Sequence, residues 1–182
     1  MGMAAPVYYT AEMVRNLPDD GKRYETVHGE LLVTPAPRLW HQRIVLRLIR
    51  ILADYVENGP LGELLLSPAD ISWSPDTLVQ PDLFVVCLDE ARTEEWSDIK
   101  TLLLVVEVLS PGTARQDRFT KRRLYQEVGV PLYWIVDPDQ KAIEEWTPEA
   151  RFPTVERNRV AWHPEGAAEP FELDLEELFK PI

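Results

Sequence analysis

Two nearly uninterrupted apolar runs, Leu83–Leu88 and Leu102–Leu109, place the strongest constraint on how this chain can fold. Each run is too short to be a membrane-spanning helix, which needs roughly 18 or more apolar residues. Runs of this length are typical of β-strands that are covered on both faces. Helices supplied by the rest of the chain are therefore expected on both faces of the sheet.

Two long segments have the periodicity of amphipathic helices. From about Arg38 to Glu57, apolar side chains recur at helical spacing and charged side chains fall on the opposite face. A second helix is predicted from about Ala114 to Val128, where Gly129 ends it. Shorter helices are predicted at Thr10–Asn16, with Thr10 as the N-cap, and near Leu175–Phe179.

Turn residues divide the remaining chain into short strands. Tyr24–Val27 and Glu30–Thr34 are predicted to form a hairpin across His28-Gly29, because both turn positions need a positive φ that glycine adopts freely. The order of helices and strands predicts one mixed sheet with helices on its faces. The other predicted strands are Glu63–Leu66, Ala69–Trp73, Leu132–Asp137 and Ala142–Trp146.

Length and composition favour one domain that spans residues 1–182. The chain has 182 residues, of which 45% are hydrophobic and 27% charged, and no low-complexity linker divides it. Within this domain we expect residues 1–20 to be an N-terminal arm and short helix. Residues 147–182 are expected to be an acidic C-terminal extension that packs on the same domain.

The net charge of −12 opposes, for the chain as a whole, binding to nucleic acid or to an anionic membrane. A local exception lies between Arg115 and Arg123, where five cations face one acid and could contact a phosphate backbone. The single cysteine, Cys87, excludes a disulfide framework and a multi-cysteine zinc site. Cys87 is predicted to be a buried, small apolar residue.

The first six residues contain neither the charged region nor the apolar core of a signal peptide. With no apolar run long enough to span a bilayer, we expect the protein to be cytoplasmic and to have no membrane partner.

Two carboxylates at the ends of the apolar runs are candidate functional residues. Glu107 lies near the end of one run, where burying it costs several kcal/mol unless it is paired or binds a cation. Asp82 directly precedes the other run. Structural roles are the alternatives, an ion pair for Glu107 and a turn for Asp82. If the two strands are neighbours, the pair could hold Mg²⁺ or Mn²⁺.

Lys121 and His41 lie on helix faces that also carry apolar residues. Lys121 shares a face with Leu124 and Val128, so we expect it to point toward the sheet near Glu107. The alternative is a solvated pair of Lys121 with Asp117. His41 falls on the buried face where its helix begins and could be structural, or could orient a water or contact a phosphate.

Pro81-Asp82, Glu107 and a following lysine resemble the skeleton of the PD-(D/E)XK nuclease superfamily. Further segments resemble one group within it, the Uma-two family of bacterial putative restriction endonucleases, first catalogued as a domain of unknown function. The resemblance covers about Thr10 to Trp146. The segments that carry it are Tyr24-Glu25, Gly29-Glu30-Leu31, His41, Glu107-Val108-Leu109-Ser110-Pro111, Asp117, Lys121, Tyr125 and Tyr133-Trp134-Ile135-Val136-Asp137-Pro138.

This resemblance implies an α/β (mixed α+β) fold, with a restriction-endonuclease-like central mixed sheet, flanking helices and an N-terminal β-hairpin. It further implies that Asp82 and Glu107 hold Mg²⁺ or Mn²⁺ and that Lys121 orients the attacking water and the phosphate. Glu30 would add a carboxylate from the hairpin, and His41 would line the site. In the general superfamily pattern the lysine follows the acid by two residues, a position that is Leu109 here.

Three functions remain open at this point. The first is a metal-dependent endonuclease that hydrolyses phosphodiester bonds in DNA, and cleavage of both strands would favour a homodimer. The second is a catalytically silent nucleic-acid-binding or scaffold protein with the same fold. The third is a metal-dependent hydrolase of another substrate, and a glycosidase has no support from the lysine or the basic helix.

Overall fold

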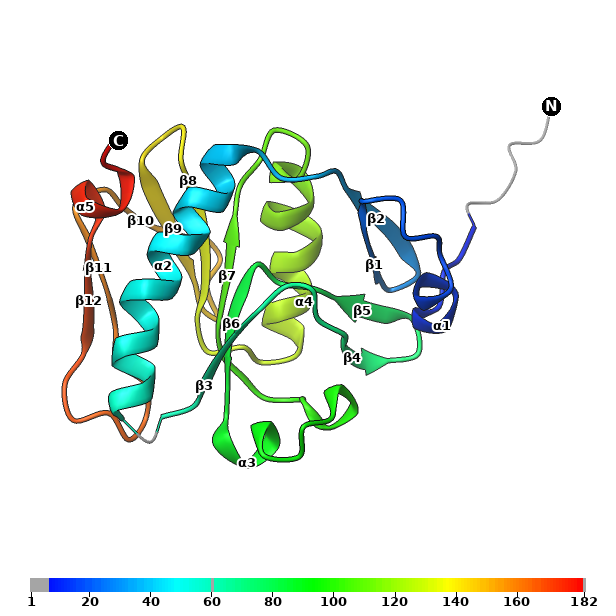
Figure 1. Ribbon diagram of the computed structural model, residues 1–182, viewed down its shortest axis with the longest axis horizontal. Helices are drawn as coiled ribbons and strands as arrows, with labels where there is room; N and C mark the ends of the chain where they lie inside the picture. The colour runs from blue at the N-terminus through cyan, green and yellow to red at the C-terminus, as the bar shows by residue number, and fades with distance from the viewer. Residues whose placement is uncertain (1–6, 60, 182) are drawn as a thin grey trace.

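A computed structural model of the protein describes residues 7–59 and 61–181, and a six-stranded mixed sheet forms its centre (Figure 1). The two apolar runs of the sequence form adjacent central strands, β6 and β7, as predicted. β7 and β8 are parallel, and every other pair of neighbours is antiparallel. In spatial order the strands are β10 (Thr154–Glu156), β9 (Ala142–Trp146), β8 (Tyr133–Asp137), β7 (Leu102–Val108), β6 (Leu83–Val86) and β3 (Glu63–Leu66).

One face of the central sheet is covered by the long helix α2, Leu39–Asn58, which lies in front of the sheet in Figure 1. Its buried apolar stripe packs against alternate residues of β6, β7 and β8. The C-terminal hairpin of β11 (Arg159–Trp162) and β12 (Phe171–Asp174) shares this core, as does α5 (Leu175–Phe179). This C-terminal segment therefore packs on the same core as α2.

The opposite face of the sheet is covered by a second helical segment and by a smaller sheet. The segment begins with a π-helix, η2 (Gln116–Lys121), and continues as α4 (Arg122–Glu127). Four strands form the smaller sheet, and the short helix α1 packs against it (Figure 1). These elements are α1 (Ala11–Arg15), β1 (Arg23–Val27), β2 (Glu30–Thr34), β4 (Ile71–Ser74) and β5 (Thr77–Val79).

The structure corrects the expectation of one sheet. The predicted hairpin of β1 and β2 forms, and its turn has the positive φ angles required, 49° at His28 and 80° at Gly29. However, β1 pairs with β5, a strand that was not predicted, and so joins the smaller sheet. Cys87 is half-buried, because β6 ends at Val86 and the short helix α3 (Leu88–Ala91) begins directly after it.

The predictions about a signal peptide and about membrane-spanning helices concern the N-terminus and the helices of the chain. Residues 1–6, on which the argument against a signal peptide depends, lie outside the described part of the chain. Among the helices of residues 7–59 and 61–181, none has both the length and the apolar character that crossing a membrane requires.

Candidate active site

Two carboxylates face each other where β6 and β7 meet. These strands are antiparallel, with Leu83 opposite Val106, so Asp82 continues the register opposite Glu107. Side chains of directly opposite residues point to the same face of a sheet, with Cβ atoms about 4.5–5.5 Å apart. The backbone N–H of Val108 donates a hydrogen bond to Asp82 Oδ2 at 2.9 Å and holds this carboxylate against β7. The two strands are therefore neighbours, which is the condition under which Asp82 and Glu107 could hold a metal ion together.

Asp82 is also held by side chains from β1 and α2. Arg23 Nη1 donates a hydrogen bond to Asp82 Oδ1 at 2.9 Å, and His41 Nε2 lies 3.0 Å from Oδ2. Burial raises the pKa of Asp82, but the hydrogen bond with His41 and the charge of Arg23 outweigh burial. The pKa of Asp82 therefore lies well below its usual value, and this side chain is an anion at neutral pH.

Glu107 is buried, with 1% of its surface exposed, and its two oxygens have different surroundings. Oε1 accepts a hydrogen bond from Lys121 Nζ at 2.8 Å and lies 3.4 Å from the hydroxyl of Tyr125. Oε2 has no hydrogen-bond partner among the described residues. Burial raises the pKa of Glu107 well above its usual value, the charge of Lys121 opposes this, and the charge of Asp82 adds to it.

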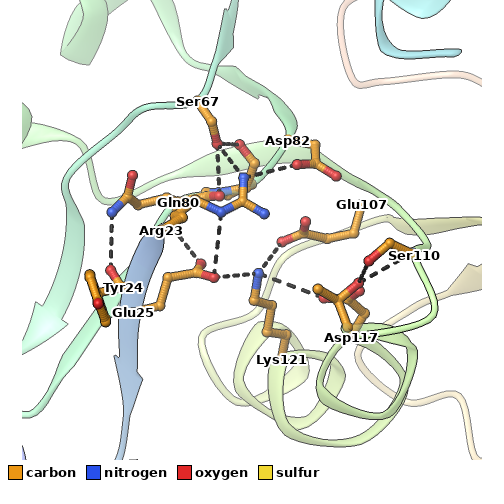
Figure 2. Close-up of polar contacts among 12 residues, drawn as sticks. Arg23, Tyr24, Glu25, Ser67, Gln80, Asp82, Glu107, Ser110, Asp117 and Lys121 are labelled. Atoms are coloured by element: carbon orange, nitrogen blue, oxygen red, sulfur yellow. Dashed lines mark hydrogen bonds and ion pairs between the residues drawn. The ribbon is translucent and has the colours of Figure 1, made fainter. Parts of the chain in front are cut away.

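Lys121 extends from η2 toward three carboxylates (Figure 2). Besides Glu107, its Nζ lies 2.9 Å from Glu25 Oε2 on β1 and 3.6 Å from Asp117 Oδ1. Burial lowers the pKa of Lys121, but the charges of the three carboxylates raise it by a larger amount. The pKa of Lys121 is therefore above its usual value. Lys121 is therefore a buried cation, and the prediction that it points toward Glu107 is confirmed.

The buried cluster contains more acid than base. Two of its charged side chains are cations, Arg23 and Lys121, and four are carboxyls: Glu25, Asp82, Glu107 and Asp117. With every group ionised, the negative charges exceed the positive charges by the charge of one divalent cation. This imbalance and the unpartnered oxygen of Glu107 fit a bound cation.

Asp82 and Glu107 offer a metal ion two carboxylates as protein ligands. Among residues 7–59 and 61–181, no group of three or more His, Cys, Asp or Glu side chains is arranged to hold a metal ion. Mg²⁺ needs fewer protein ligands than that, because it commonly binds through one or two carboxylates and keeps several waters. Asp82 and Glu107 therefore suit Mg²⁺, or the similar Mn²⁺, better than a metal that needs a complete protein cage.

A cleft with a volume of about 540 Å³ opens between the smaller sheet, the start of α2 and the segment Ser67–Asp70. Asp82, Glu107 and His41 all line it. Lys121 does not, so this lysine lies behind Glu107 as seen from the cleft. Of the four carboxyls in the buried cluster, Asp82 and Glu107 are thus the two that line the cleft.

The hairpin contributes a different carboxylate from the one predicted. Glu30 pairs with Val27 at the turn end of the hairpin, and its side chain is exposed and outside the cluster. Glu25 instead lies fully buried, accepting a hydrogen bond from the backbone N–H of Gln80 at 2.7 Å and contacting Lys121. The alternation in β1 could have revealed this, because Glu25 shares a face with the apolar, buried Val27.

The basic stretch between Arg115 and Arg123 is not one continuous cationic surface. Lys121 is buried, and Arg118 forms ion pairs of 2.7 Å with both Asp137 and Glu144. Arg122 is occupied by Gln126 and by the ring of Trp146. Only the exposed side chains of Arg115 and Arg123 remain as free cations of this stretch that could meet a phosphate backbone.

The buried carboxyl of Asp117 allows a prediction about pH. Burial raises its pKa from 3.8 to about 6, although Lys121 opposes the shift. A folded-state pKa above the unfolded value means that stability falls as pH rises from about 4 to 6, by roughly 3 kcal/mol in total. In Asp117→Asn this loss is absent, so the variant is expected to gain stability over the wild type as pH increases through this range.

Urea unfolding of both proteins at pH 4.5 and 7.5 measures the effect. Asp139→Asn, which changes an exposed carboxyl, is the matched control and is expected to follow the wild type. Parallel pH profiles for Asp117→Asn and the wild type would contradict the prediction.

Comparison with known proteins gives the class of protein to which this fold belongs, a family of nuclease-like proteins. The chain belongs to the Uma2 family, described as "putative restriction endonuclease", whose model matches residues 11–176. This confirms the family predicted from the sequence segments around Asp82, Glu107 and Lys121.

Among solved structures, the chain is similar to the crystal structure of a "putative nuclease belonging to DUF820" from Anabaena variabilis. The two share 22% sequence identity with a TM-score of 0.76, over 94% of this chain and 97% of that one. The similarity confirms the mixed α/β fold. No curated protein matches the chain.

Proposed function

We propose that the protein is an endonuclease that uses a divalent cation, Mg²⁺ or Mn²⁺, to hydrolyse phosphodiester bonds in DNA. The observation that carries this proposal is the pair of Asp82 and Glu107. They lie opposite each other on neighbouring strands and line a cleft, and Glu107 Oε2 is buried without a hydrogen-bond partner in the described part of the chain. Membership of the Uma2 family supports the same chemistry.

In this proposal, different residues of the site bind the cation and position its ligands. Asp82 and Glu107 would hold the cation, which supplies an activated water and stabilises the charge that develops on the phosphate. His41 and the backbone N–H of Val108 hold Asp82 in place. Lys121 would act as a positioning residue, because it contacts Glu107 Oε1 and leaves Oε2 without a hydrogen-bond partner among the described residues.

The position of Lys121 bears on the alternative of a catalytically silent protein. Leu109, where the superfamily pattern has its lysine, is buried and uncharged. Lys121 brings an ammonium group to Glu107 from η2 instead, so the site has a lysine despite the change on the strand. The complete set of charges favours the active nuclease over the silent scaffold.

Calorimetric titration with Mn²⁺ tests the metal site without a known substrate. The wild type is expected to bind Mn²⁺, and Asp82→Asn is expected to bind it at least about 100-fold more weakly, because a neutral amide replaces a ligand. Asp70→Asn is the matched control, because Asp70 lines the same cleft but pairs with Arg15.

Cleavage assays on single-stranded DNA, duplex DNA and RNA then test the reaction. Metal-dependent cleavage of DNA by the wild type, lost in Asp82→Asn, is the expected outcome. Equal Mn²⁺ affinity in the wild type and Asp82→Asn would remove the metal site from Asp82. Binding of Mn²⁺ without cleavage of any nucleic acid would instead favour the scaffold, or a hydrolase of another substrate.

A further inference from the structure

Arg23 on β1 lies in the position from which a cation would approach Asp82. Its Nη1 donates to Asp82 Oδ1 at 2.9 Å and to Ser67 Oγ at 3.0 Å (Figure 2). The side chain is 19% exposed and lines the cleft together with Asp82 and Glu107. Arg23 is thus the cation of the buried cluster that is in contact with the cleft, whereas Lys121 is enclosed.

The two oxygens of Asp82 are not equally free to bind a metal ion. Oδ2 is held by the backbone N–H of Val108 and by the ring of His41 from α2. Oδ1 is held by the side chain of Arg23. A divalent ion that binds Asp82 Oδ1 and Glu107 Oε2, which has no hydrogen-bond partner among the described residues, would lie beside the guanidinium group. Repulsion between the two cations favours displacement of Arg23.

We propose that Arg23 is a resident cation that competes with the divalent ion for Asp82 and, once displaced, contacts the phosphate of the substrate. This inference rests on the proposed nuclease function. A guanidinium group is weakly hydrated and matches phosphate oxygens with two parallel hydrogen bonds, so a phosphate in the cleft is a suitable new partner.

The competition couples the two ligands of the site. A divalent ion that takes Asp82 releases Arg23 for the phosphate, and a phosphate that draws Arg23 away frees Asp82 for the ion. Because such coupling is reciprocal, each ligand raises the affinity for the other by the same factor. The metal ion alone is then bound weakly, and the metal ion with DNA is bound tightly.

Titration with Mn²⁺ alone tests the competition. Arg23→Gln is expected to bind Mn²⁺ about tenfold more tightly than the wild type, because the fraction of protein with a free Asp82 rises. Lys22→Gln, which removes an exposed cation of the same cleft paired with Asp20, is the matched control and is expected to match the wild type. An affinity of Arg23→Gln equal to or below that of the wild type would overturn the inference.

A second measurement uses the wild type and does not depend on how the variant folds. The NMR signal of the Arg23 Nε–H is expected to shift on addition of Mg²⁺ as the guanidinium group leaves Asp82. A signal that stays in place while Mg²⁺ binds would overturn the inference.

Binding of a short DNA duplex, with and without Ca²⁺, tests the phosphate contact. Ca²⁺ is expected to increase DNA affinity in the wild type, and Arg23→Gln is expected to lose about tenfold of this increase. An equal increase in both proteins would overturn the phosphate contact.

Failure of this inference and failure of the proposed function give different results. Mn²⁺ affinity that Asp82→Asn leaves unchanged overturns the proposed function. Loss of binding in Asp82→Asn, together with equal affinity in Arg23→Gln and the wild type, overturns only the role of Arg23.

Discussion

Glu107→Gln is expected to lower DNA cleavage by about a thousandfold and to abolish Mn²⁺ binding, while the protein remains folded. The amide has nearly the same shape as the carboxylate but no charge with which to hold a cation. The fold is expected to tolerate the change, because burial already disfavours the charged form of Glu107. Lys121 keeps Glu25 and Asp117 as partners. Cleavage rate, Mn²⁺ calorimetry and thermal unfolding measure the three quantities.

Glu127→Gln is the matched control for this prediction. Glu127 is an exposed carboxylate on α4 that pairs with His28 away from the cleft, and its change is expected to leave cleavage and Mn²⁺ binding unaltered. Cleavage at the wild-type rate by Glu107→Gln would show that Glu107 holds no cation during the reaction.

Lys121→Met is expected to give the largest loss of stability, about 3–5 kcal/mol at pH 8. Removing one partner from a buried ion pair leaves uncompensated charge in the interior, and Lys121 contacts three carboxylates. The deficit is expected to shrink as pH falls. The pKa values of Glu107 and Asp117 are already raised in the folded state, and protonated carboxyls no longer need a cation.

Urea unfolding at pH 8 and pH 5 measures both parts of this prediction. Lys22→Met, at an exposed position paired with Asp20, is the control and is expected to change stability by no more than about 1 kcal/mol. A loss as small as that in Lys121→Met, or a loss that does not depend on pH, would show that Lys121 does not neutralise the cluster.

The parts of the site that could be predicted from the sequence depend on local periodicity. Asp82 and Glu107 could be found because a carboxylate beside a run of buried apolar residues needs a partner. The direction of Lys121 followed from its helical spacing to Leu124, which is buried in the core. Each of these inferences needs only the residues of one strand or one helix.

The remaining parts depend on which segments pair across the fold. The alternation in β1 indicates that Glu25 is buried, but its contact with Lys121 of η2 depends on how β1 packs in the fold, which no local pattern specifies. The spacing of apolar residues does not predict that η2 is a π-helix, because the same apolar face is compatible with an ordinary α-helix. β11 and β12 are not among the predicted strands, because their short apolar stretches are stabilised as strands by packing on the core beneath α2.

Under the proposed nuclease function, the buried ions that cleavage requires also lower the stability of the fold. Replacing a buried ionic cluster by apolar side chains of similar volume often leaves a fold intact and raises its stability by about 1–4 kcal/mol. In this protein the ions join the smaller sheet to the central sheet, through Lys121 between Glu25 and Glu107. A library selected for heat resistance alone is therefore expected to lose these charges first, whereas a library selected for cleavage must keep them and tolerate a lower melting temperature.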